Sequence, residues 1–138
     1  MKRALLLCLA LACGSQAPQH YQCTPGSGTP SSLSGQWSDN KFGYYGEFTL
    51  HLYGTPDHLC GSGRLGPPTR ETRAGLSGTE KRLRWDAVCT LESYLGWQPP
   101  CELNQIVDTT WYDVVQIDGN TIQLNNTGRL YRVPGGQE

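Results

Sequence analysis

Strict alternation of apolar and polar side chains marks two segments of the chain, residues 47–53 and residues 81–89. A period of two places successive side chains on opposite faces, so each segment predicts a β-strand with one buried and one solvated face. The apolar positions of the two segments are Phe48, Leu50, Leu52, Leu83, Trp85 and Ala87. We expect both strands to contribute to the core of the protein.

The C-terminal third of the chain predicts a three-stranded antiparallel meander. Residues 109–117 are rich in β-branched and aromatic residues, and Asp118-Gly119-Asn120 is a strong hairpin turn. Residues 121–125 and 129–133 continue the strand pattern on either side of a second turn. The meander therefore consists of neighbouring strands joined by tight turns.

The remaining segments carry weaker signals. Residues 59–65 predict a short strand, weakened by its glycines. Residues 66–80 combine Pro, Gly and charged residues and predict a long loop. Residues 90–100 have apolar residues at near-helical spacing before two prolines, which predicts one helical turn.

Short strands separated by tight turns, without a long amphipathic helix, predict an all-β fold, either a small antiparallel β-barrel or a sandwich. The chain of 138 residues has room for one domain, which we place at residues 33–134. The side chains expected mostly inside are Trp37, Phe48, Leu50, Leu52, Leu83, Trp85, Trp111, Val115, Ile122 and Leu124.

The first dozen residues have the two parts of a secretory signal. A basic start, Met1-Lys2-Arg3, is followed by an apolar run that ends at Ala12 and is too short to span a bilayer. We therefore expect export, with residues 1–12 as the signal peptide. Residues 13–32 consist largely of Pro, Gly, Ser, Thr and Gln and predict a flexible tether.

The run Ala10-Leu11-Ala12-Cys13 resembles the lipobox of bacterial lipoproteins, in which the cysteine is lipidated and becomes the new N-terminus. The resemblance implies a palmitate-type lipid anchor on Cys13 and a position on a membrane of the cell envelope, outer or periplasm-facing. The alternative is ordinary cleavage after Ser15-Gln16-Ala17, which would give a secreted protein. Pro18 would then follow the scissile bond, where it fits an extended protease substrate poorly.

Two of the six cysteines belong to the signal and the expected anchor, and four remain in the domain and its tether. An even number in an oxidising compartment predicts two disulfides. Among the three possible pairings we favour Cys23 with Cys60 and Cys89 with Cys101. Zinc is disfavoured, because no C-x-x-C occurs and the three histidines do not fall at ligand spacing. We expect neither a metal nor a cofactor.

Charge adds one exclusion. Without the signal, nine Lys and Arg residues stand against twelve Asp and Glu residues, a net charge near −3. This balance does not fit a nucleic-acid-binding protein. The basic residues between Arg64 and Arg84 are interleaved with acidic ones, which predicts a solvated loop and strand edge.

The segment Leu33-Ser34-Gly35-Gln36-Trp37 resembles the Gly-x-Trp first strand of lipocalin-like and avidin-like barrels. The C-terminal hairpin and last strand are similar to the end of small lipocalin-like lipoproteins. The resemblance implies a lipocalin-like barrel that Trp37 closes at one end. It also implies that an arginine of the last strand, Arg132 or Arg129, packs over the Trp37 ring.

Aromatic residues are the main indication of function. They either line the mouth of the barrel and accept a small apolar ligand, or they fill a barrel whose interior has room only for side chains. The candidate ligand-binding residues are Tyr44, Tyr45, Trp85, Trp97, Trp111 and Tyr112.

Catalytic motifs are weak by comparison. No Gly-x-Ser-x-Gly elbow occurs, and the domain cysteines are expected to be paired. His51 and His58 flank a turn near Asp57, but a histidine on the polar face of a strand is ordinarily solvated. We expect a non-catalytic, lipid-anchored envelope protein that binds a small apolar ligand or an envelope protein. The alternatives are an interaction or inhibitor lipoprotein without a pocket, and a small secreted hydrolase.

Overall fold

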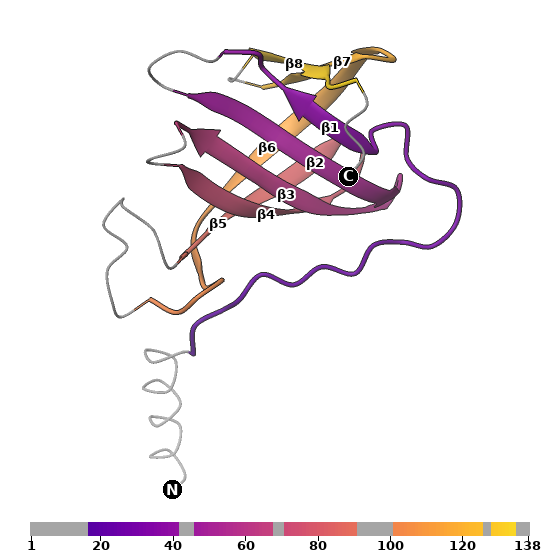
Figure 1. The fold of residues 1–138 in the computed structure, drawn as a ribbon. Helices are drawn as coiled ribbons and strands as arrows, with labels where there is room; N and C mark the ends of the chain where they lie inside the picture. The colour runs from indigo at the N-terminus through magenta and orange to yellow at the C-terminus, as the bar shows by residue number, and fades with distance from the viewer. Residues whose placement is uncertain (1–16, 42–45, 68–70, 91–100, 126–127, 135–138) are drawn as a thin grey trace, which may run out of the picture.

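The computed structural model describes residues 17–41, 46–67, 71–90, 101–125 and 128–134. These residues form antiparallel strands that close into one barrel (Figure 1). The strands are β1 (Gly35–Ser38), β2 (Glu47–Thr55), β3 (His58–Gly66), β4 (Thr72–Gly78), β5 (Arg82–Val88), β6 (Ile106–Asp118), β7 (Thr121–Leu124) and β8 (Gly128–Arg132).

Each strand pairs with the next one in the chain, and β1 closes the barrel by pairing with β8. In the closing ladder Trp37 lies opposite Arg132, and Ser38 lies opposite Tyr131. Closure pairs the edge strands that a short meander would otherwise leave open. The all-β prediction is confirmed, and of the two predicted architectures the chain adopts the barrel.

The long loop expected at residues 66–80 is wrong, because β4 occupies half of that range. β4 pairs with both β3 and β5 along its length. Its inward residues Ala74 and Leu76 are buried and alternate with Gly75 and Ser77 on the outer face. Gly and Ser are typical of turns rather than strands, so the alternation was hidden by small residues.

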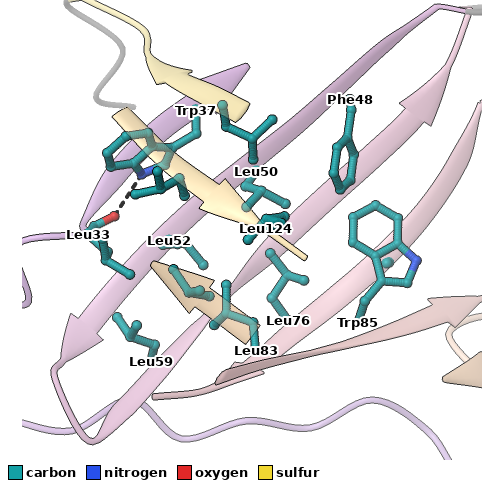
Figure 2. Packing of buried hydrophobic residues seen from close by; sticks show 14 of the residues in the cluster. Leu33, Trp37, Phe48, Leu50, Leu52, Leu59, Leu76, Leu83, Trp85 and Leu124 are labelled. Atoms are coloured by element: carbon teal, nitrogen blue, oxygen red, sulfur yellow. Dashed lines mark hydrogen bonds between the residues drawn. The ribbon is translucent and has the colours of Figure 1, made fainter. Parts of the chain in front are cut away.

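The barrel interior holds a continuous apolar cluster (Figure 2). Eight of the ten side chains expected inside are buried, but Trp111 and Val115 are 45% and 57% exposed. The prediction for these two is wrong, because the inward-facing residues of β6 are displaced by one position from those expected. Tyr112 lies opposite Leu83 and Val114 opposite Leu124, which turns the alternate residues of β6 outward.

Trp37 fills one end of the barrel, which we call the Trp37 end. Its indole N–H donates to the Leu33 carbonyl at 2.9 Å, and both side chains are buried. The guanidinium carbon of Arg132 lies 4.3 Å from the Trp37 ring centroid. Of the two arginines considered for a contact with the Trp37 ring, Arg132 and Arg129, Arg132 makes it.

The N-terminal segment, residues 19–31, is attached to the outer wall of the barrel. The disulfide Cys23–Cys60 joins it to β3. The Tyr21 hydroxyl donates to the Leu76 carbonyl at 2.5 Å. In Figure 1 the segment runs along the wall before the chain enters β1. This part of the expected tether is therefore held against the domain.

The second disulfide joins Cys89, just after β5, to Cys101, before β6. Both predicted cysteine pairings are thus confirmed. The helical turn expected at residues 90–100 falls outside the described residues, except for residue 90. Cys13 and the rest of the signal and tether before residue 17 also lie outside them.

Candidate functional site

Three aromatic side chains from different strands meet inside the barrel. The Phe48 ring centroid is 5.2 Å from that of Trp85 and 6.2 Å from that of Tyr112. Trp85 and Tyr112 are 6.4 Å apart and perpendicular. Figure 2 shows Phe48 and Trp85 on one side of the leucines and Trp37 on the other. We call the side with the three rings the Phe48 end. Two predicted ligand-binding residues, Trp85 and Tyr112, are therefore brought together here.

The position of Trp85 depends on small inward residues in the neighbouring strands. A Cβ atom at Gly63 of β3 would overlap the six-membered ring of the Trp85 indole. Gly63 lies opposite Ala74, so two small residues in adjacent strands leave the space that the indole fills. Trp85 is consequently buried, and it packs as part of the core.

Inward-facing positions next to the aromatic rings are open to solvent. Leu65 lies directly opposite Phe48 and shares its inner face, yet Leu65 is 46% exposed and Phe48 only 5%. Thr110 lies opposite Trp85 and is exposed as well. The inner surface is therefore accessible at the Phe48 end, whereas Trp37 and Leu33 fill the other end.

Tyr112 is the polar group of the aromatic cluster. Burial raises the pKa of its phenol above the ordinary value of 10.0. A phenol is protonated at neutral pH even at the ordinary value, so the hydroxyl can donate a hydrogen bond, while the ring offers apolar surface. Such a combination orients an apolar ligand that carries a single polar group.

Trp111 does not belong to this site. It lies on the outer face of β6, where the guanidinium carbons of Arg82 and Arg84 are 4.5 Å and 5.8 Å from its ring centroid. These cation–π contacts cover part of the indole from outside the barrel. The candidate ligand-binding residues outside the described residues are Tyr44, Tyr45 and Trp97.

The two histidines considered for acid–base chemistry are separated. His51 lies opposite Ser62, and His58 lies opposite Thr55. Four positions along β2 correspond to roughly 13 Å, which is beyond hydrogen-bond distance. Among the described residues no group of three or more metal-ligating side chains occurs. That same part of the chain contains no helix long and apolar enough to cross a membrane.

A hollow that the sequence did not reveal lies on the outer face of the barrel. It has a volume of about 430 Å³ and includes Tyr21, Arg64 and Arg73 in its lining. These residues come from the N-terminal segment, β3 and β4, so no local sequence pattern joins them. The two arginines were interpreted as part of a solvated loop and strand edge, but both lie within paired strands.

Comparison with protein-family models, with curated proteins and with solved structures gives no match for this chain. Three features of the molecule itself bear on its function. These are the aromatic cluster at the Phe48 end, the exposed outer face of β6 to β8, and the outer groove.

Proposed function

We propose that this protein is an exported, lipid-anchored, non-catalytic binding protein that holds a small apolar ligand at the Phe48 end of its barrel. The contrast between Phe48 and Leu65 carries the proposal. They are opposite neighbours on one inner face, but only Phe48 is buried. A ligand that covers Leu65 and the edges of the aromatic rings gains about 25 cal/mol for each Å² of apolar surface removed from water.

The three rings supply the floor of the proposed site. Their tilted and perpendicular packing fixes them before a ligand arrives, which lowers the entropy cost of binding. The Tyr112 hydroxyl is the polar group suited to orient the ligand. The chemistry that fits is a small, largely apolar molecule with one hydrogen-bond acceptor.

Binding of the neutral fluorophore N-phenyl-1-naphthylamine tests this site. The variant Leu65→Arg places a charge on the exposed inner face and should weaken binding about tenfold or more. Val115→Arg is the matched control, because it adds the same charge at an exposed position on the outer face of β6. Equal binding by the two variants, or none by the unmodified protein, would contradict a ligand site at the Phe48 end.

Export and anchoring are supported by the signal-like N-terminus, the lipobox resemblance at Cys13, and two disulfides that persist in oxidising compartments. Intact mass of the membrane-extracted protein, before and after reduction and alkylation, tests both. We expect a chain that starts at Cys13, carries acyl groups and shows four further thiols only after reduction. An unmodified chain that starts near Pro18 would contradict the anchor and indicate secretion.

A second candidate is an interaction lipoprotein that docks a protein on the outer face of β6 to β8. The observation in its favour is that Val115 and Ile117 of β6 and Tyr131 of β8 are all exposed there. Large apolar side chains exposed on one face are found at interaction sites. For this candidate the two variants exchange roles. Cross-linking to an envelope protein in intact cells would be abolished by Val115→Arg and retained by Leu65→Arg.

A further inference from the structure

The outer groove spans the face of β1, β2, β3 and β4 and has a volume within the range of small-molecule sites. Its central row consists of residues that lie opposite one another in successive strands. That row is Gln36, His51, Ser62 and Gly75. The N-terminal segment borders the groove with Tyr21, and the arginines Arg64 and Arg73 occupy the next row.

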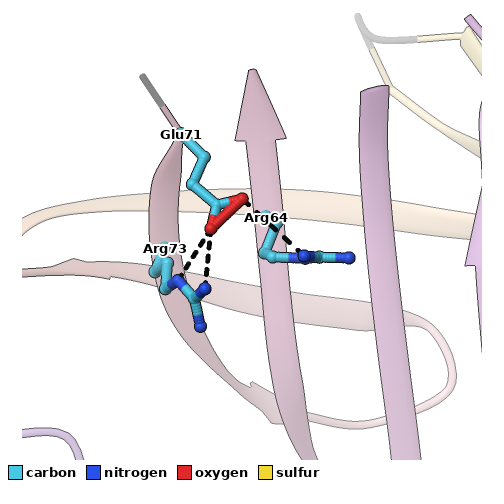
Figure 3. A network of polar contacts seen from close by, with 3 residues as sticks. All are labelled: Arg64, Glu71 and Arg73. Carbon is cyan, nitrogen blue, oxygen red and sulfur yellow. Dashed lines mark hydrogen bonds and ion pairs between the residues drawn. The ribbon is translucent and has the colours of Figure 1, made fainter. Parts of the chain in front are cut away.

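Arg64 and Arg73 lie directly opposite each other on the outer face. Like charges at such a position lower the stability of a sheet. The Glu71 carboxylate lies between the two guanidinium groups (Figure 3). Arg73 donates to Glu71 Oε2 from Nε at 3.0 Å and from Nη2 at 2.7 Å, whereas Arg64 Nη1 is 3.7 Å from Oε1. One carboxylate cannot neutralise two guanidinium groups, so the trio keeps a net positive charge.

The arginines remain accessible to an anion. About half of each arginine side chain is exposed, and the contact of Arg64 with Glu71 is long. Neither Asp nor Glu occurs among the described residues that line the groove. Guanidinium groups pair with carboxylate or phosphate oxygens in a planar, two-pronged geometry. The groove is therefore suited to an anionic group.

The rest of the lining is suited to hydroxyl groups. The Tyr21 ring packs over Gly75, where a Cβ atom would overlap it. Its hydroxyl donates to the Leu76 carbonyl at 2.5 Å and lies 3.3 Å from the Gly61 carbonyl. The ring is thereby held as a fixed apolar surface. Nearby polar side chains make no hydrogen bond within the described part of the chain, so their donors and acceptors are available to a ligand. They are Gln36, Thr49, Ser62 and Asn104.

We propose that this groove binds a small anionic saccharide, with its carboxylate or phosphate between Arg64 and Arg73 and its hydroxyl groups on the polar lining beside Tyr21. The two guanidinium groups supply charge-assisted hydrogen bonds, and the amide and hydroxyl side chains fix the orientation of the sugar. The groove lies on the outer face of the barrel, whereas the proposed site at the Phe48 end lies on the inner face. Each site can consequently fail without the other.

Calorimetric titration of the mature protein tests the proposal with trigalacturonate, glucose 6-phosphate and neutral maltotriose as probes. We expect an anionic probe to bind and maltotriose not to bind. Binding of the anionic probe should weaken in about 0.5 M salt, because salt at this concentration screens surface charges. Arg64→Gln and Arg73→Gln should each raise the Kd about tenfold. Arg129→Gln, at an exposed position of β8 outside the groove lining, is the matched control and should leave the Kd unchanged.

Glu71→Gln gives a second test with the opposite sign. Removing the carboxylate frees Arg73 and raises the positive charge of the groove, so the Kd for the anionic probe should fall roughly fivefold. Damage to the fold cannot increase affinity, which separates this result from a structural effect.

The pattern of probe binding identifies or rejects the ligand class. Tighter binding of trigalacturonate points to a carboxylate sugar, and tighter binding of glucose 6-phosphate points to a sugar phosphate; both support the proposal. Equal binding of maltotriose would overturn it, because charge would then play no part. Inorganic phosphate binding as tightly as glucose 6-phosphate would overturn it too, since the sugar would then add nothing. Absence of heat with all probes also rejects it.

Discussion

The guanidinium group of Arg132 lies over the indole of Trp37, with 4.3 Å between its carbon and the ring centroid, in the ladder that closes the barrel. Its two terminal nitrogens donate to the carbonyls of Ser32 and Ser34, each at 2.7 Å. Its Nε donates to the Gly119 carbonyl at 3.1 Å. One side chain therefore joins the last strand to the approach of β1 and to the turn after β6.

Replacing Arg132 should destabilise the whole barrel. Arg132→Ala removes the cation–π contact and leaves three carbonyls without their donor, which should lower the free energy of unfolding by about 2 to 4 kcal/mol. Urea denaturation measures this, with Arg129→Ala as a control expected to change stability by less than about 0.5 kcal/mol. A loss for Arg132→Ala no larger than that of the control would show that closure does not depend on this side chain.

The packing of Trp85 against Gly63 gives a second prediction. Gly63→Ala adds a methyl group where the indole lies and should cost about 1 to 3 kcal/mol in unfolding experiments. Gly119→Ala is the matched control, because a Cβ atom there has open space around it. In the double variant Gly63→Ala/Trp85→Leu the costs should not add, because the smaller side chain relieves the overlap. Simple additivity would contradict the proposed contact.

Strands with one solvent-exposed face and one buried face could be predicted from the sequence. In β2 and β5 the apolar residues occupy every second position, as the burial of Phe48, Leu50 and Trp85 confirms. In β6 both faces carry large apolar side chains, Tyr112 and Val114 inward and Trp111 and Val115 outward. Alternation alone could not set that register, because either choice buries apolar surface.

Residues of the candidate sites could be predicted only where the residue pattern of a single strand indicates them. Trp85 and Tyr112 follow from aromatic residues at strand positions, although their contact with Phe48 depends on barrel closure. The outer groove was not predictable, because Tyr21 and Arg73 are distant in sequence and meet only when the N-terminal segment crosses β4. The Cys23–Cys60 disulfide, which the sequence did predict, is one of the contacts that hold that segment against the barrel.

Removal of the Cys23–Cys60 disulfide should cost more stability than removal of Cys89–Cys101. The first bridge spans 37 residues and the second 12. The chain-entropy relation then gives about 4 kcal/mol for the first and about 3 kcal/mol for the second. Paired Cys→Ser variants, compared by urea denaturation under identical conditions, measure the difference. The reverse order would show that strain or residual unfolded structure outweighs loop length.

Alkaline pH should destabilise the protein through Tyr112. Burial raises the pKa of its phenol, so the folded protein keeps this proton at a pH at which the unfolded chain, with a pKa near 10, has lost it. The folded state then binds more protons than the unfolded state, and the free energy of unfolding falls as pH rises. The stabilising contribution of Tyr112 is complete below the pKa of the unfolded chain. It is lost as pH rises from that value through the higher pKa of the folded protein.

The variant Tyr112→Phe removes this titration and should flatten the decline of stability between about pH 9 and about pH 11. Some slope should remain, because burial also raises the pKa of Tyr21. Urea midpoints collected across this pH range compare Tyr112→Phe with the unmodified chain. If Tyr112→Phe keeps the slope of the unmodified chain, then the Tyr112 phenol is hydrated in solution. The aromatic cluster at the Phe48 end would then be more exposed to solvent than the packing of Tyr112 against Phe48 and Trp85 indicates.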